Sequence, residues 1–244
     1  MSNQTIAITG GTSFTGLWIS RHFVENGWTV YAQTSRKKTE YLGLRSIRAQ
    51  VLEESRVEVA WNLKVERGDF ESWIRRVKPQ VWIHHHHFME EFRSPSYDHA
   101  RARKISLDPL AQTLKTLKEV GCRGVLYSGT YFEPGEGGLE NSGEPTPYAR
   151  SKNETWKALE NLCSEHGLLL SKVVIPNPIG PFENSDRLIP QMIRAARAKA
   201  PFTLGSPDTV GDQIAVTALS KTYLMAAENL LKNRSGVYRP SGFQ

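Results

Sequence analysis

Residues 5–16 read Thr-Ile-Ala-Ile-Thr-Gly-Gly-Thr-Ser-Phe-Thr-Gly, a β-branched apolar run that passes into a glycine-rich loop. The run predicts a buried strand at 5–9, and the next residues predict a helix over 14–25, ended by Gly27. Glycines at 10, 11 and 16 permit a tight turn and a close approach of the backbone to a phosphate at the helix N-terminus. Ser13 stands where a third glycine is expected. This strand–loop–helix unit predicts a βαβ fold.

The same alternation continues along the chain. Strands are predicted at 29–34, 57–63, 80–84, 124–128 and 169–175, and helical segments at 69–73, 97–120 and 148–166. This rhythm favours an α/β fold, a Rossmann-type doubly wound parallel sheet with a small C-terminal substrate lobe. We expect a dinucleotide-binding domain over 1–175 and a lobe, short or truncated, over 176–244. A strand near 209–217 is a candidate to return to the first domain.

Composition limits the class of protein. The chain has 244 residues, 39% of them hydrophobic, and a mean hydropathy of −0.44, which are typical of a globular protein. No apolar run approaches the roughly 20 residues of a membrane span, and the first residues lack the pattern of a signal peptide. Only two cysteines are present. These features predict a cytoplasmic protein without disulfide bonds.

The formal charge of +6 is spread along the chain. Scattered basic residues favour multiply anionic small ligands, and no recognition motif supports nucleic-acid binding. We expect a small-molecule substrate, with neither nucleic acid nor a membrane as a partner.

Tyr148 and Lys152 form the most informative pair of side chains. Four residues apart on a predicted helix, they share one face. An ammonium beside a phenol lowers the tyrosine pKa, which makes a usable proton donor and acceptor. The spacing alone is weak evidence, and the surrounding pattern strengthens it.

The end of the second predicted strand bears on the cofactor. An Asp or Glu about 20 residues beyond the glycines would hold a ribose 2′-hydroxyl. Residues 35–38 read Ser-Arg-Lys-Lys instead, and Arg36 with Lys37 would suit a 2′-phosphate. This favours NADP, with NAD as the alternative. The first cofactor-binding candidates are Gly10, Thr12, Ser13, Phe14, Gly16, Arg36, Lys37 and Asp69.

With the glycine loop, the Tyr148/Lys152 pair and Ser128-Gly129-Thr130, the chain resembles an extended short-chain dehydrogenase/reductase of the NAD-dependent epimerase/dehydratase family. The resemblance implies an enzyme in which Tyr148 is the acid/base. Lys152 would bind the nicotinamide ribose and lower the tyrosine pKa. Ser128 would hydrogen-bond the reacting oxygen, and Thr130 would share that role.

The same resemblance implies further roles. Segment 175–181 is similar to the family segment in which a Pro flanks the nicotinamide and an Asn meets a sugar nucleotide, here Pro176 and Asn177. Arg187 resembles a substrate-lobe residue. Dimers in this family pair two helices, here 97–120 and 148–166, so a homodimer is expected. The remaining cofactor-binding candidates are Phe70, His84 and His86.

Four consecutive histidines, 84–87, depart from the family pattern. A metal site is disfavoured because neighbouring strand residues point to opposite faces and no cysteine or acidic residue is adjacent. We expect no metal, some imidazoles in the sheet and some along the cofactor groove.

The residues after Ser128 narrow the choice of reaction. Dehydratases of the family place Asp-Glu after the catalytic Thr, whereas Tyr131 comes after Thr130 here. An NADPH-dependent ketoreductase acting on a nucleotide-activated sugar or similar ketone is therefore the first hypothesis. An NAD-dependent nucleotide-sugar epimerase is the alternative, and a non-catalytic dinucleotide-binding protein is a second one.

Overall fold

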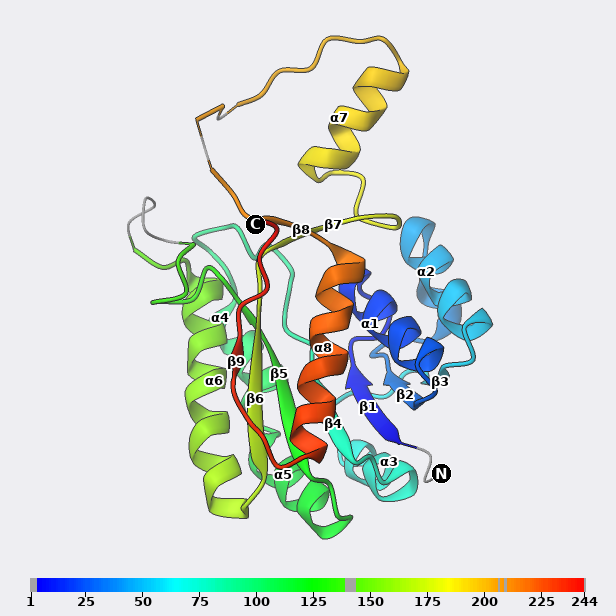
Figure 1. The fold of residues 1–244 in the computed structure, drawn as a ribbon, viewed down its shortest axis with the longest axis vertical. Helices are drawn as coiled ribbons and strands as arrows, with labels where there is room; N and C mark the ends of the chain where they lie inside the picture. The colour runs from blue at the N-terminus through cyan, green and yellow to red at the C-terminus, as the bar shows by residue number, and fades with distance from the viewer. Residues whose placement is uncertain (1–3, 139–143, 206, 209, 244) are drawn as a thin grey trace.

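The computed structural model describes residues 4–138, 144–205, 207–208 and 210–243 (Figure 1). Within them a seven-stranded parallel sheet has the order β3-β2-β1-β4-β5-β6-β9. Its strands are β1 (Thr5–Thr9), β2 (Thr29–Gln33), β3 (Glu58–Ala60), β4 (Val81–His84), β5 (Gly124–Thr130), β6 (Leu169–Ile175) and β9 (Val237–Tyr238). The order reverses between β1 and β4, the point at which doubly wound folds bind ligands.

Two layers of helices cover the sheet, and the side-chain period of β1 shows why. Ile6 and Ile8 join a core with helix α1 (Phe14–Glu25) and helix α8 (Val216–Leu231). Ala7 faces a second core with α3 (Asp69–Val77), α5 (Leu110–Glu119) and α6 (Pro147–His166). Alternate residues of a strand point to opposite faces, so a strand buried on both faces is apolar throughout. The predicted fold class is confirmed.

Element boundaries follow local chemistry. Thr146 caps α6 by accepting from Ala149 N, with Pro147 at the first helical position, and Gly167 ends the helix at φ 61°. The helical segment predicted at 97–120 is two helices, α4 (His99–Ser106) and α5, separated around Pro109. Three further α-helices were not predicted, α2 (Gly43–Glu54), α7 (Leu188–Arg197) and α8.

The chain after residue 176 contributes strands to both sheets. Strand β7 (Asn177–Ile179) pairs with β8 (Gln213–Ala215) in a separate two-stranded sheet. The strand expected near 209–217 is therefore β8, which does not join the main sheet, and Thr209 lies outside the described residues. The strand that does return is β9, parallel to β6. The division at 175/176 into a domain and a lobe stays a prediction.

Helix α7 (Leu188–Arg197) stands away from the rest of the molecule (Figure 1). It buries none of its side chains. No helix among the described residues has the length and apolar character needed to cross a membrane.

Candidate functional site

The glycine loop between β1 and α1 is built to hold an anion. Gly10 has φ +76°, a left-handed conformation that favours glycine. A Cβ on Gly16 would overlap Gly10 O and come within 2.7 Å of Ser13 Oγ. Ser13 Oγ instead accepts from Gly16 N at 3.0 Å and caps the helix. Serine therefore replaces the expected glycine without breaking the turn.

Gln33, at the end of β2, holds this loop in place and was not predicted. Its Oε1 accepts from Gly10 N at 3.2 Å, and its backbone carbonyl accepts from the amides of Gly10 and Gly11. Its Nε2 donates to Leu63 O. A buried polar residue at a strand end, two percent exposed, is the signal that could have revealed it.

The turn after β2 is less basic than its sequence predicts. Arg36 and Lys37 are exposed, and so is Asp69 at the start of α3. Glu40 folds back, so that its Oε2 accepts from Lys37 N at 3.1 Å. The Glu40 carboxylate therefore lies beside the basic residues of this turn. Because a carboxylate repels a 2′-phosphate, the argument for NADP is weaker than the sequence of residues 35–38 indicates.

Tyr148 and Lys152 lie at the start of α6, beside the carboxyl end of β5. Lys152 is buried, donates to Ser128 O and lies 4.8 Å from the centre of the Tyr127 ring. Tyr148 packs against the rings of His87, Phe92 and Tyr97, at centroid distances of 5.5, 5.4 and 6.0 Å. Within the described part of the chain, the Tyr148 hydroxyl makes no hydrogen bond to Ser128 or to Lys152.

The expected lowering of the Tyr148 pKa is wrong for this structure. Burial raises the pKa of Tyr148, and Tyr97 and Glu133 add to the shift. Burial also lowers the pKa of Lys152 to about 8, against the opposing effect of Glu133. The Lys152 ammonium is directed to Ser128 O and not to the Tyr148 hydroxyl. With these pKa shifts Tyr148 is a protonated phenol near neutral pH, and Lys152 is mostly charged.

Ser128 is held by two side chains that the sequence did not identify. His85 Nδ1 lies 2.7 Å from Ser128 Oγ, and Tyr223 of α8 donates to the same oxygen at 2.6 Å. The other ring nitrogen of His85, Nε2, lies 2.9 Å from Thr15 Oγ1 and 3.2 Å from Ser13 Oγ. One imidazole thus connects the end of β5 with the glycine loop.

The other imidazoles of the run face elsewhere. His84 and His86 stack at 4.6 Å, and their Nε2 atoms lie 3.3 Å from Ser106 O and 3.1 Å from Ile105 O in α4. The rings of these two candidates therefore pack under α4, although the His86 backbone lies against Gly10, and the ring that reaches the loop is that of His85. In the described part of the chain, no group of three or more His, Cys, Asp or Glu residues is arranged to hold a metal ion.

Thr130 borders a buried cluster of charges. Thr130 N donates to Glu133 Oε1 at 2.7 Å, and Thr130 itself is buried. Lys172 of β6 lies 2.6 Å from Glu133 and 2.9 Å from Glu136. Glu133 is therefore neutralised by a lysine and is not presented to a substrate.

The remaining candidates are dispersed. Phe70 is fully buried between Trp73 and Trp82, away from the groove. Pro176 is buried at the end of β6, and Asn177 Nδ2 donates to Tyr131 Oη at 2.8 Å. Arg187 precedes α7 and lies 3.4 Å from Glu183. The structure brings Ser128, Lys152 and the glycine loop together and leaves Phe70 and Arg187 apart from them.

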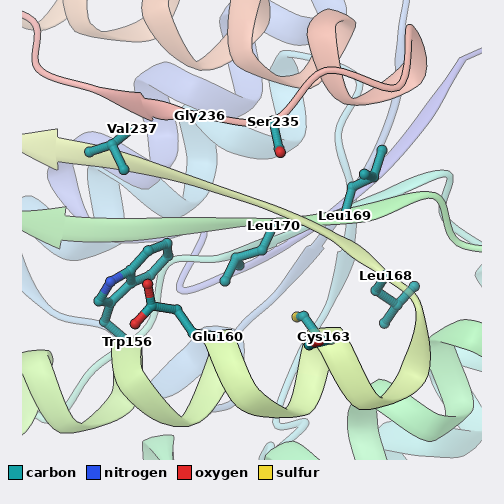
Figure 2. A pocket seen from close by; sticks show the side chains of 10 residues that line it. Trp156, Glu160, Cys163, Leu168, Leu169, Leu170, Ser235, Gly236 and Val237 are labelled. Atoms are coloured by element: carbon teal, nitrogen blue, oxygen red, sulfur yellow. The ribbon is translucent and has the colours of Figure 1, made fainter.

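A separate groove runs between α6 and the edge formed by β6 and β9, as Figure 2 shows. Trp156, Cys163 and Leu168 are among its lining residues. Leu168 and Leu169 lie at the amino end of β6, so this part of the groove is at the opposite end of the sheet from Ser128.

Comparison with known proteins places the chain in a family. The model of the NAD dependent epimerase/dehydratase family matches residues 6–238. The chain belongs to this family. The resemblance stated from the sequence is confirmed, and with it an enzyme of the extended short-chain dehydrogenase/reductase type. No curated protein matches the chain.

Solved structures share the fold at low identity. One is UDP-N-acetylglucosamine 4-epimerase from Methanobrevibacter ruminantium with UDP-N-acetylmuramic acid, 17% identical, TM-score 0.77, covering 99% of this chain and 77% of that one. Another is UDP-glucuronic acid 4-epimerase from Bacillus cereus with UDP-glucuronic acid and NAD, 16% identical, TM-score 0.78, covering 99% and 78%. A third is UDP-glucose 4-epimerase from Thermus thermophilus with NAD, 18% identical, TM-score 0.72, covering 99% and 78%.

The residues at the glycine loop fit the pyrophosphate of a dinucleotide. The backbone amides of Phe14 and Thr15, in the first turn of α1, have no acceptor among the described residues. Free amides and the positive end of a helix dipole suit a phosphate. The loop therefore offers a phosphate site, whereas His85 stands between that site and Ser128.

Proposed function

We propose that this protein is an NAD-dependent epimerase acting on a nucleotide-activated sugar. The observation that carries the proposal is the His85 bridge, which places Ser128 and the glycine loop one imidazole apart. Lys152 donates to Ser128 O from α6, so Lys152, Ser128 and the glycine loop lie at the same end of the sheet. The Glu40 carboxylate at the β2 turn and the NAD bound by structurally similar epimerases support NAD over NADP.

The chain's own residues would move the proton and hold the sugar oxygen. A bound nicotinamide supplies a hydride acceptor and donor. Tyr148 would exchange a proton with the sugar hydroxyl, while Ser128 would hydrogen-bond the same oxygen. In this structure the Lys152 ammonium is directed to Ser128 O, so it would have to turn toward Tyr148 to stabilise the phenolate that remains when Tyr148 has given up its proton.

The acid/base role predicts the behaviour of one variant. Tyr148→Phe keeps the aromatic contacts and removes the hydroxyl, so turnover of a UDP-sugar should fall by about 10²-fold or more, as loss of a general acid/base does. Interconversion of UDP-glucose, UDP-N-acetylglucosamine and UDP-glucuronic acid with their 4-epimers is measured by chromatography. Tyr97→Phe is the matched control, and turnover of Tyr148→Phe within a few-fold of wild type would refute the role.

An NADPH-dependent ketoreductase is the second candidate. The exposed Arg36 and Lys37 after β2 favour it. The nucleotide released when the purified protein is denatured separates the two: tightly held NAD supports the epimerase. An exchangeable NADP, with weaker NADPH binding in Arg36→Ala and NADH unchanged, supports the reductase.

Two further expectations remain predictions, a homodimer and a cytoplasmic location. For the homodimer, α4, α5 and α6 form one helical layer on one face of the sheet (Figure 1). Sedimentation analysis of wild type tests it, and a single species at 27.5 kDa would refute the dimer.

A further inference from the structure

His85 uses both of its ring nitrogens, one toward β5 and one toward the glycine loop. On one side Nδ1 meets Ser128 Oγ at 2.7 Å, and on the other Nε2 meets Thr15 Oγ1 at 2.9 Å. The backbone is fixed as well, since His85 N donates to Thr9 Oγ1 at 3.0 Å. The residue is therefore held at three points.

One tautomer of His85 gives every neighbouring hydroxyl a consistent role. Tyr223 Oη donates to Ser128 Oγ at 2.6 Å, and we assign the single proton of the Ser128 hydroxyl to His85 Nδ1. His85 Nε2 then carries hydrogen and donates to Thr15 Oγ1. Burial lowers the pKa of His85 to about 3, helped by the Lys152 charge, which agrees with a neutral ring.

This ring lies between the N-terminus of α1, where Thr15 is, and Ser128 at the end of β5. The phosphate site is at the first turn of α1, where Thr15 lies, and the reacting end belongs beside Ser128 and Lys152. The His85 ring itself forms the bridge between Thr15 and Ser128. A ligand that contacts both hydroxyls directly would take the place of that ring.

We infer that His85 decides how much of a dinucleotide the groove admits. With the ring in place, a nucleoside diphosphate binds at the N-terminus of α1. A full dinucleotide binds only after the ring leaves Thr15 and Ser128, and this frees the Ser128 hydroxyl for a substrate. The inference rests on the proposed function and adds a specificity-determining residue to it.

Removal of the ring should therefore favour the longer ligand. Protein with the His85 ring in place cannot bind the dinucleotide, so the apparent affinity for NAD is the intrinsic affinity multiplied by the fraction of protein with the ring displaced. His85→Ala should bind NAD about tenfold more tightly than wild type, a factor equivalent to about 1.4 kcal/mol. ADP should bind both proteins within about twofold. Calorimetric titration measures these four affinities, and no turnover is needed.

Two further variants serve as an alternative substitution and as a control. His85→Asn shortens the side chain but keeps it polar, and should also tighten NAD binding if His85→Ala does not fold. His99→Ala removes a half-exposed imidazole at the start of α4, whose Nε2 lies 3.2 Å from Glu154, and should leave both affinities unchanged.

Magnetic resonance of the imidazole nitrogens gives a second readout. Free protein and the ADP complex should both show His85 protonated at Nε2 with Nδ1 accepting, and NAD should abolish that signature. Equal or weaker NAD binding by the His85 variants would overturn the inference and leave the proposed function intact. Failure of wild type and variants alike to bind NAD would overturn the proposed function as well.

Discussion

The histidines at 84–87 are held in their neutral form by burial. Desolvation is the largest cause of a lowered pKa at each of the four, and the positive charge of Lys152 adds to it. The pKa of His85 falls to about 3 and that of His86 to about 4. An unfolded chain would titrate these rings near a pKa of about 6.5.

This difference predicts that acid destabilises the fold. Between the folded and unfolded pKa values the unfolded chain binds more protons, so the four histidines contribute stability that is complete above about pH 6.5. That stability is lost as pH falls towards 4. Urea unfolding should show a lower midpoint at pH 5 than at pH 7.5, and His86→Asn should show a smaller difference. A midpoint independent of pH would contradict the burial of neutral rings.

Alternation along a strand explains how far these side chains were predictable. Strand neighbours point to opposite faces, so the sequence predicts that His84 and His86 share a side and that His85 differs. Which side faces the groove depends on α4 and α8, which meet the strand from distant parts of the chain. Ser106 O and Tyr223, about 20 and 140 residues away, decide it, and no local pattern contains them.

Buried charges tie three strands together at the carboxyl end of the sheet. Lys172 on β6 lies between Glu133 and Glu136, which come after β5, and Glu136 also meets Arg239, just after β9, at 2.7 Å. Glycine at 129 leaves room for this lysine, because a Cβ there would overlap the end of the Lys172 side chain. The Arg239–Glu136 ion pair thus helps to hold the two-residue strand β9 at the edge of the sheet.

Removing only the lysine should be costly. Lys172→Met leaves two buried carboxylates without their ammonium, and loss of one partner of a buried pair costs about 3–5 kcal/mol. Lys172→Met with Glu133→Gln removes one charge of each sign, so most of that loss should be recovered. Chemical denaturation measures both, with Lys115→Met on the exposed face of α5 as the control. A double variant no more stable than the single one would contradict an ionic origin.

The helices differ in how strongly their local sequence predicts them. Helix α6 was predicted over 148–166, and the structure adds Thr146 as its cap and Pro147 as its first residue, with Gly167 at its end. Helix α2 has no side-chain cap, and its buried face includes Arg48, whose guanidinium donates to Phe182 O at 2.8 Å. Helix α8 also lacks a cap and buries Ser220 against its own backbone. Without cap residues and with polar side chains inside, local pattern gives little warning of a helix.

The molecule as a whole combines a two-layered α/β body with a projecting arm. Helices α1, α2 and α8 cover one face of the sheet, and α3, α5 and α6 the other. The arm, residues 185–205, carries α7 away from both layers (Figure 1). Leu188, Met192 and Ile193 on α7 are 44%, 42% and 54% exposed, so the arm gains little stability from burial.

Such an arm should open far more readily than the body. Segments with few buried contacts unfold locally at a small fraction of the global free energy, and proteases cut where they open. Brief trypsin digestion of native protein should therefore cleave first at Arg194, Arg197 or Lys199. Lys115 and Lys157, which are exposed on helices packed against the sheet, serve as internal controls and should resist, because their helices open only with the body. Mass spectrometry of the first fragments locates the cut, and a first cut within α5 or α6 would show that the arm is held as firmly as the sheet.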